Sequence, residues 1–173
     1  MCGIIGINSN KPVSVTIINS LKKLEYRGYD SAGIATLKNN FINEKKCSGR
    51  VEELEKILFK SPSDGNIGIG HVRWATHGVP NILNAHPHSS ENVSVVHNGI
   101  IENSDELKME LESKGLKFKS QTDTEVITLL ITEALNNNEP LESVFKTLNK
   151  LKGSFALGII FKDFSDIIIG ARR

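Results

Sequence analysis

Apolar side chains recur along this chain at two spacings, one typical of strands and one typical of helices. Isoleucines at positions 4, 5 and 7 predict a short buried strand at the start of the chain. Runs of apolar and β-branched residues predict further strands near 32–37, 67–74, 93–97, 155–161 and 166–170. The strands therefore gather toward the two ends of the sequence.

Apolar residues three or four positions apart predict amphipathic helices between these strands. Ser14 is placed to cap a first helix, in which Ile17, Ile18 and Leu21 share one face. A second helix is expected over 51–59. Both helices have one apolar side, so each is expected to cover a sheet.

Helix-start signals are strongest in the second half of the chain. Asn103 with Glu106 fits a capping box, and Thr122 with Glu125 fits another. Pro140 is a favoured first-turn residue and is expected to begin a further helix. Three helices are therefore predicted between residues 103 and 153.

This order of elements favours an α+β fold, or layered sheets covered by helices, over a regular alternation of strand and helix. With 173 residues, the chain fits one domain spanning 1–173. A domain of this size buries roughly 70% of the surface of its unfolded chain. No internal repeat or long linker divides the sequence.

The charge balance argues against partners that are bound mainly by electrostatics. Lys and Arg number 21 and Asp and Glu 20, so the formal net charge of +1 favours neither nucleic acid nor an anionic membrane. The sequence shows no membrane-spanning stretch and no signal peptide. Its two cysteines make no disulfide framework, and the expected location is the reducing cytoplasm.

Cys2 is the candidate nucleophile. If Met1 is removed, Cys2 becomes the N-terminus and carries both a thiol and a free α-amine. The ordinary pKa of an α-amine is about 7.7–8.0 and that of a thiol about 8.5, so near neutral pH the amine can act as the base of the thiol. N-terminal-nucleophile catalysis uses this arrangement. The alternative is that Cys2 is an incidental small residue at the start of a buried strand. The other cysteine, Cys47, is interpreted as a thiol without a catalytic role.

Arg73 and Asp123 are candidates for binding the two charged groups of an amino acid. The guanidinium of Arg73 could grip a carboxylate with two parallel hydrogen bonds, whereas a surface ion pair is the alternative. Asp123 could bind an ammonium group, or it could serve only as a favourable acidic residue in the first turn of a helix.

The dipeptide Asn98-Gly99 allows two interpretations. Asn-Gly between apolar strands is a strong signal for a tight hairpin turn. The side-chain amide of Asn98 and the backbone N–H of Gly99 could instead form an oxyanion hole, in which the loss of one donor typically costs about 10²–10³ in rate. A tight turn is also a rigid support for such donors, so both interpretations can hold.

All five histidines fall within one window, which raises the question of a metal site. None of their spacings matches an HExxH motif or a paired C-x-x-C site, and the carboxylate in the window is Glu91. No metal is therefore expected. The histidines are His71, His77, His86, His88 and His97.

Together these segments resemble the glutamine amidotransferase domain of the glutamine–fructose-6-phosphate aminotransferase family. The likeness runs from residue 2 to roughly the end of the chain, and the segments that carry it are, in order, 2–4, 24–33, 73–78, 84–88, 97–103 and 122–125. The segments 26–33 and 73–78 are the most specific, since Cys-Gly-Ile is shared by all class II amidotransferases. The resemblance implies a four-layer αββα N-terminal-nucleophile fold with no cofactor.

The resemblance also implies roles for individual residues. Cys2 would attack the side-chain amide of glutamine, and Asn98 and Gly99 would stabilise the oxyanion. Arg73 would bind the α-carboxylate of glutamine and Asp123 its α-amino group. The remaining implied residues are Thr76 and His77 beside Arg73, Arg27 for positioning the N-terminal loop, and Trp74 and His86 near the passage of ammonia.

In the whole enzyme of this family, ammonia travels to a sugar-isomerase domain and aminates fructose 6-phosphate. No sugar-phosphate site is found in this sequence, so the expectation is an incomplete amidotransferase domain that hydrolyses glutamine, within a homo-oligomeric enzyme. Two other readings remain open. One is an amidotransferase domain of another class II family, such as amidophosphoribosyltransferase, and the other is a ligand-sensing or histidine-rich metal-binding module without enzymatic activity.

Overall fold

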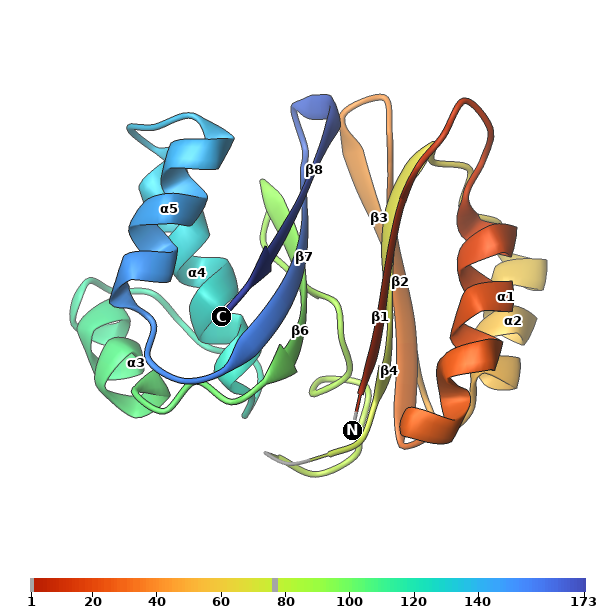
Figure 1. The fold of residues 1–173 in the computed structure, drawn as a ribbon, viewed down its shortest axis with the longest axis horizontal. Helices are drawn as coiled ribbons and strands as arrows, with labels where there is room; N and C mark the ends of the chain where they lie inside the picture. The colour runs from red at the N-terminus through yellow and green to blue at the C-terminus, as the bar shows by residue number, and fades with distance from the viewer. Residues whose placement is uncertain (1, 76–77) are drawn as a thin grey trace.

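Two antiparallel sheets of four strands pack face to face in the computed structural model, which describes residues 2–75 and 78–173 (Figure 1). Helices cover the outer face of each sheet, so the layers follow the order helix, sheet, sheet, helix. The expected α+β class and the four-layer αββα arrangement are therefore confirmed.

The first sheet holds both the start of the chain and its most buried strand. Its strand order is β1-β4-β2-β3, with every pair antiparallel. The helices α1 and α2 cover its outer face through an apolar cluster that includes Ile17, Leu21 and Leu54. The elements of this half are β1 (Gly3–Asn8), α1 (Ser14–Leu24), the short 3₁₀ helix η1 (Glu25–Arg27), β2 (Ser31–Lys38), β3 (Phe41–Ser48), α2 (Val51–Lys60) and β4 (Ile67–Arg73).

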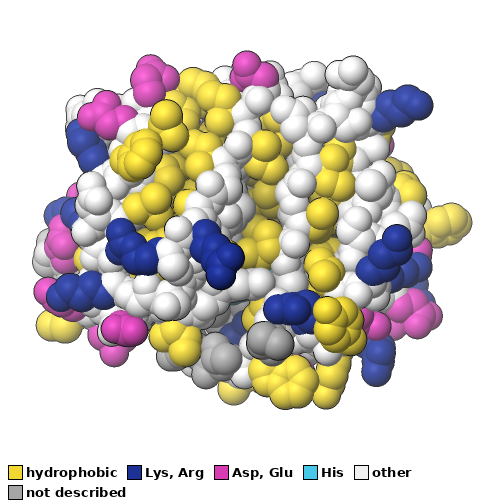
Figure 2. Space-filling view, in the orientation of Figure 1, with side chains coloured by type: hydrophobic (Ala, Val, Ile, Leu, Met, Phe, Trp, Pro, Cys, Tyr) yellow, Lys and Arg dark blue, Asp and Glu magenta, His cyan; other side chains and the backbone are white. Residues whose placement is uncertain are grey.

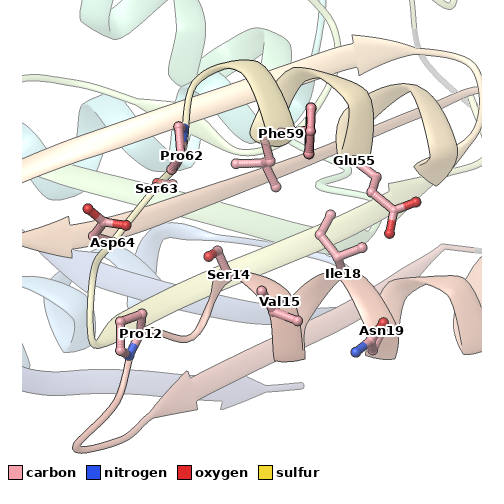
Figure 3. Close-up of a pocket in the computed structure, with 11 residues that line it drawn as sticks. Pro12, Ser14, Val15, Ile18, Asn19, Glu55, Phe59, Pro62, Ser63 and Asp64 are labelled. Carbon is pink, nitrogen blue, oxygen red and sulfur yellow. The ribbon is translucent and has the colours of Figure 1, made fainter.

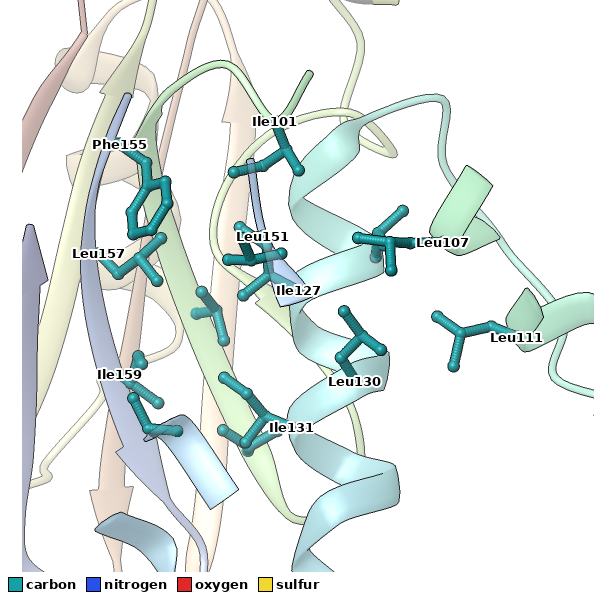
Figure 4. Packing of buried hydrophobic residues seen from close by; sticks show 14 of the residues in the cluster. Ile101, Leu107, Leu111, Ile127, Leu130, Ile131, Leu151, Phe155, Leu157 and Ile159 are labelled. Atoms are coloured by element: carbon teal, nitrogen blue, oxygen red, sulfur yellow. The ribbon is translucent and has the colours of Figure 1, made fainter. Parts of the chain in front are cut away.

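The second sheet has the order β5-β6-β7-β8 and is covered by three helices. Ile127 and Ile131 of α4 lie against β6 and β7, and Leu107 of α3 lies beside α4 (Figure 4). The elements are β5 (His88–Ser89), β6 (Val93–Gly99), α3 (Ser104–Ser113), α4 (Asp123–Leu135), α5 (Pro140–Lys150), β7 (Phe155–Phe161) and β8 (Phe164–Arg172). The predicted strands and helices are all present, whereas β5 and most of β3 were not predicted.

A smaller apolar cluster joins the two sheets. Ile69 of β4, Val96 of β6 and Ile160 of β7 belong to it, and each is fully buried. Successive side chains of a strand point to opposite faces, so residues an even number apart share a face. His71 and Arg73 therefore lie on the same inner face as Ile69, and Asn98 lies on the same inner face as Val96.

The helix starts differ from the predicted caps. Val13, not Ser14, precedes α1, and none of the residues that precede α1, α3 and α4 makes a side-chain capping bond. Asn103 instead bridges two backbone groups at the end of α5: its amide donates to the carbonyl of Lys150 and accepts the N–H of Lys152. Asn103 therefore makes a tertiary contact rather than capping α3.

A cavity of about 410 Å³ lies between α1 and α2 on the outer side of the first sheet (Figure 3). Val15 and Ile18 reach it from α1, and Phe59 reaches it from α2. Its lining contains carboxylates but no thiol, imidazole or cationic group. The chemistry indicated by the sequence therefore lies elsewhere.

Candidate active site

Cys2 lies at the start of β1, beside the end of β4. The pairing of Gly3 with Val72 places Cys2 opposite Arg73 across the two strands. The backbone N–H of Trp74 points to the Cys2 sulfur at 3.2 Å, and the thiol lies 3.5 Å from the carbonyl oxygen of the same residue. Partial burial raises the pKa of the Cys2 thiol, although the hydrogen bond from Trp74 opposes this effect.

Two side chains fix the backbone of Cys2. The Nε of Arg27 and the Nδ2 of Asn98 each donate to the Cys2 carbonyl oxygen, at 3.1 Å in both cases. Arg27 comes from η1 and Asn98 from the end of β6, so the two halves of the molecule meet at this residue. Arg27 therefore contacts the N-terminal segment, and its role in positioning that segment stays a prediction.

The dipeptide Asn98-Gly99 does not form a hairpin turn. Both residues remain in β6 and pair with Ala156 and Phe155 of β7, a strand far along the chain. Gly99 has φ of +134°, and a Cβ there would lie 2.2 Å from the carbonyl oxygen of Ser154. Glycine is therefore required at this strand end by backbone conformation and by the close approach of β7.

Arg73 is a buried cation at the end of β4. Its exposed fraction is 4%, and burial lowers the pKa of its guanidinium, while the neighbouring Cys2, Asp30 and Asp123 act in the opposite direction. Asp30 holds the following segment in place, because its carboxylate accepts the N–H of Ala75 at 2.8 Å and its own N–H donates to the carbonyl of Arg73 at 3.0 Å.

Asp123 is the first residue of α4 and is largely buried. One of its carboxylate oxygens accepts the N–H of Ile101 at 2.9 Å, and the other lies 3.7 Å from Nδ1 of His97. Asp123 therefore contacts residues outside its own helix, and its role in binding an ammonium group stays a prediction.

Two cavities meet at Cys2. A small one of about 20 Å³ is lined by Cys2, Arg73 and Asp123 together with Trp74, His86, His97, Gly99 and Thr122. A larger one of about 410 Å³ shares Cys2, Trp74 and Gly99 and extends to Asn98 and Arg27. The thiol, the cation and the carboxylate therefore border one space, which in this state has room for about one water molecule.

Four of the five histidines form a buried cluster behind these groups. His71 stacks on His86, with ring centroids 4.2 Å apart, and His86 in turn lies against His88 and His97. Burial lowers the pKa of His71 and of His88 to about 3 and that of His86 well below its usual value. None of these four histidine side chains is visible on the face shown in Figure 2.

The contacts within this cluster indicate which ring nitrogen of His86 carries the proton. The backbone N–H of His97 donates to Nδ1 of His86 at 3.3 Å, so Nδ1 is the acceptor and Nε2 carries the proton. That Nε2 lies 3.2 Å from the hydroxyl of Thr124 on α4. The described residues contain no group of three or more His, Cys, Asp or Glu side chains arranged to hold a metal ion.

The structure brings together eight of the ten residues selected from the sequence. They are Cys2, Arg27, Arg73, Trp74, His86, Asn98, Gly99 and Asp123. Thr76 and His77 lie outside the described residues. Sequence reasoning missed Asp30 and His71 as site residues, because their contacts join segments far apart in the sequence and leave no local pattern.

Cys47 lies outside the candidate site. It is buried in β3 among residues that contact α2, and burial raises the pKa of its thiol. None of the helices in the described part of the chain is long and apolar enough to cross a membrane.

Curated relatives match the whole chain. It is 51% identical over 174 residues to glutamine–fructose-6-phosphate aminotransferase (isomerizing) of Bradyrhizobium diazoefficiens, and 51% identical over 175 residues to the protein of that name from Clostridium acetobutylicum. Each match covers 100% of this chain, which spans 29% of the length of either relative.

Solved structures share the fold. The Bacillus subtilis glutamine phosphoribosylpyrophosphate amidotransferase matches with a TM-score of 0.82 at 28% identity, covering 94% of this chain and 35% of that one. A class-II glutamine aminotransferase domain protein from Silicibacter pomeroyi matches with a TM-score of 0.65 at 13% identity, covering 99% of this chain and 76% of that one. The second match supports the fold alone.

The model of the glutamine amidotransferase domain family matches residues 71–172, more than half of the chain. That segment contains Arg73, Asn98, Gly99 and Asp123 of the site described above. The chain belongs to the glutamine amidotransferase domain family.

Proposed function

We propose that this chain is the glutaminase domain of an enzyme that makes glucosamine 6-phosphate from fructose 6-phosphate and glutamine. The observation that carries the proposal is the position of Cys2, whose thiol borders one cavity with Arg73 and Asp123. The cation suits the α-carboxylate of glutamine, the carboxylate suits its α-ammonium, and the thiol suits its side-chain amide. The name and the 51% identity of the relatives favour fructose 6-phosphate as the acceptor.

The reaction uses the groups of the N-terminal residue itself. The α-amine of Cys2, exposed by removal of Met1, takes the thiol proton as sulfur bonds to the amide carbon of glutamine. Asn98 Nδ2 and the backbone N–H of Gly99 stabilise the resulting oxyanion. Collapse of this intermediate breaks the C–N bond, and the amine returns the proton to the leaving ammonia. Water then hydrolyses the γ-glutamyl thioester to glutamate.

The other site residues bind glutamine and position Cys2. Arg73 holds the α-carboxylate and Asp123 the α-ammonium, with Thr76 and His77 beside Arg73. Arg27 fixes the Cys2 carbonyl, as its hydrogen bond indicates. Trp74 lines both the small and the large cavity, which suits a side chain that controls the movement of ammonia between them. His86 also lines the small cavity and is proposed to act together with Trp74 in controlling this movement.

Glutamine binding requires these side chains to shift, because the cavity between Arg73 and Asp123 holds only about one water molecule in the present state. Trp74 is the side chain best placed to move, since it is 44% exposed and contacts Tyr29 edge-on.

The decisive experiment measures glutamate release from glutamine by the parent chain, by Cys2→Ala and by Cys47→Ala. Cys47 is the matched control, because it is a thiol in the same sheet that lies outside the site. We expect turnover by the parent and by Cys47→Ala, and none by Cys2→Ala. Equal turnover by all three proteins would refute Cys2 as the nucleophile. Intact mass of the active protein should show that Met1 is absent.

The acceptor is tested by mixing the active chain with separately produced synthase domains. Ammonia transfer to fructose 6-phosphate with an isomerase domain, and none to phosphoribosyl pyrophosphate with its synthase domain, would support the proposal. The reverse result would assign the chain to the amidophosphoribosyltransferases. The enzyme as a whole is proposed to be a cytoplasmic homo-oligomer.

A further inference from the structure

We propose that His71 is a positioning residue for glutamine hydrolysis, which orients the side-chain amide of Asn98 so that its NH₂ group faces Cys2. The inference rests on the proposed function, because it gives His71 a role in the stabilisation of the oxyanion by Asn98. Among the described residues, His71 lines neither of the two cavities that meet at Cys2, so it acts through Asn98 rather than on the substrate.

The geometry at Nε2 of His71 carries the argument. This nitrogen lies 3.0 Å from the backbone carbonyl oxygen of His97 and 2.9 Å from the side-chain oxygen of Asn98. A backbone carbonyl can only accept a hydrogen bond, so Nε2 of His71 must carry the proton. His71 is fully buried, and burial lowers the pKa of its ring to about 3, which leaves the ring neutral with Nδ1 unprotonated.

This proton determines which way the Asn98 amide points. Because Nε2 donates, the atom of Asn98 that faces it must be the amide oxygen. The NH₂ group then points the other way, where Nδ2 donates to the Cys2 carbonyl at 3.1 Å. An NH₂ group has two hydrogens, so the second is left for an oxyanion that forms at Cys2. A reversed amide would instead direct an oxygen toward the Cys2 carbonyl and would offer the oxyanion no donor.

The surroundings hold the ring of His71 in this orientation. His86 stacks on it at 4.2 Å with an angle of 28° between the ring planes. The loop that carries His86 packs tightly on β2, since a Cβ added to Gly33 would lie 2.1 Å from the carbonyl oxygen of His86. Among the described residues, Nδ1 of His71 has no hydrogen-bond partner, so a proton on that nitrogen would be buried without an acceptor.

A double-mutant cycle on the full chain tests the role. We expect His71→Leu to lower kcat for glutamine hydrolysis about 10²-fold, the usual effect of losing one oxyanion donor, with KM changed less than about threefold. In the background of Asn98→Ala, the same change should lower kcat less than about twofold, because the group that His71 positions is absent. Equal losses in both backgrounds, or full kcat in His71→Leu, would overturn the proposal.

His71→Gln is the conservative variant, because its NH₂ group can donate to the same two oxygens. We expect its kcat to stay within about tenfold of the parent, far above that of His71→Leu. Should His71→Leu fail to fold, as judged by circular dichroism, His71→Gln decides alone. A loss as large as that of Asn98→Ala would then contradict the role.

Nitrogen NMR of the His71 ring provides a readout that does not depend on activity. At pH 7 we expect a proton on Nε2 and none on Nδ1, and a proton on Nδ1 would refute the proposal even if glutamine is hydrolysed. A parent chain without turnover, equal to its Cys2→Ala variant, would instead refute the proposed function. The ring measurement would still show whether His71 orients Asn98.

Discussion

At the scale of single residues, the site depends on side chains whose chemistry has no close substitute. Arg73 is buried at the end of β4 and faces a cavity that also contains Asp123. A guanidinium presents a planar fork of donors that matches a carboxylate, whereas the ammonium of Lys is a point charge on a flexible stem. Retaining the charge alone is therefore not expected to retain the binding of glutamine.

We predict that Arg73→Lys raises KM for glutamine about 10- to 100-fold, the equivalent of about 1.5–3 kcal/mol for a hydrogen bond to a charged group. The value of kcat should change little, because Cys2 and the oxyanion donors remain. Steady-state kinetics over a wide range of glutamine concentrations checks this. An unchanged KM would remove Arg73 from the substrate site.

At the scale of elements, Asn103 shows how a local signal can serve a tertiary contact. It stands where a capping residue of α3 is expected, yet its amide connects α3 to the end of α5 through Lys150 and Lys152. The Glu106 side chain, the other half of the expected capping box, is exposed and makes no capping bond. The two positions should therefore differ in their effect on stability.

We predict that Asn103→Ala lowers the free energy of unfolding by about 1–3 kcal/mol, because two backbone hydrogen bonds are lost. Glu106→Ala should change it by less than about 0.5 kcal/mol, as is usual for a surface substitution. Urea unfolding of the two variants beside the parent measures both values. A larger decrease in the free energy of unfolding for Glu106→Ala would indicate that Glu106 does cap α3.

At the scale of the whole molecule, neutral histidines are buried where the two sheets meet α4. The pKa values of His71 and His88 are lowered to about 3 and that of His86 is lowered well below its usual value, in each case chiefly by burial. In the unfolded chain these rings take up protons near pH 6.5, but in the folded chain they do not. Proton uptake therefore favours the unfolded state as the pH falls.

We predict that the free energy of unfolding decreases as the pH is lowered from 6.5 toward 3. The slope is at most about 1.4 kcal/mol per pH unit for each of these histidines. Chemical denaturation at several pH values between 7 and 5 isolates their effect, since most carboxylates remain ionised there. A stability that is flat over this interval would contradict the prediction.

Sequence reasoning identified most elements because their apolar spacing reflects burial on one face, as in α5, or on both faces, as in β4. It failed where a local motif had a tertiary use. Asn98-Gly99 has the pattern of a turn but continues β6 against β7, a strand more than fifty residues later. The αββα layering was expected from the family resemblance, because no periodicity specifies which sheet faces which.

In the candidate site, too, a local sequence pattern does not reveal contacts between distant segments. The chemistry of Cys2 and Arg73 could be anticipated from residue type, whereas the role inferred for His71 depends on a hydrogen bond between β4 and β6. Its position within a buried strand gives no sign of that contact.

The strand β4 carries both His71 and Arg73 on one face. It pairs with β2 on one side and on the other with β1, which begins beside Cys2. A small displacement of β4 along its own axis would move the binding cation and the imidazole beneath Asn98 together. If Arg73 and His71 have the proposed roles, affinity and turnover are therefore expected to be linked through this one strand. A directed-evolution search for variants that accept a different amide should find that core substitutions behind β4 change both properties at once, and that independent tuning requires mutations on the loops.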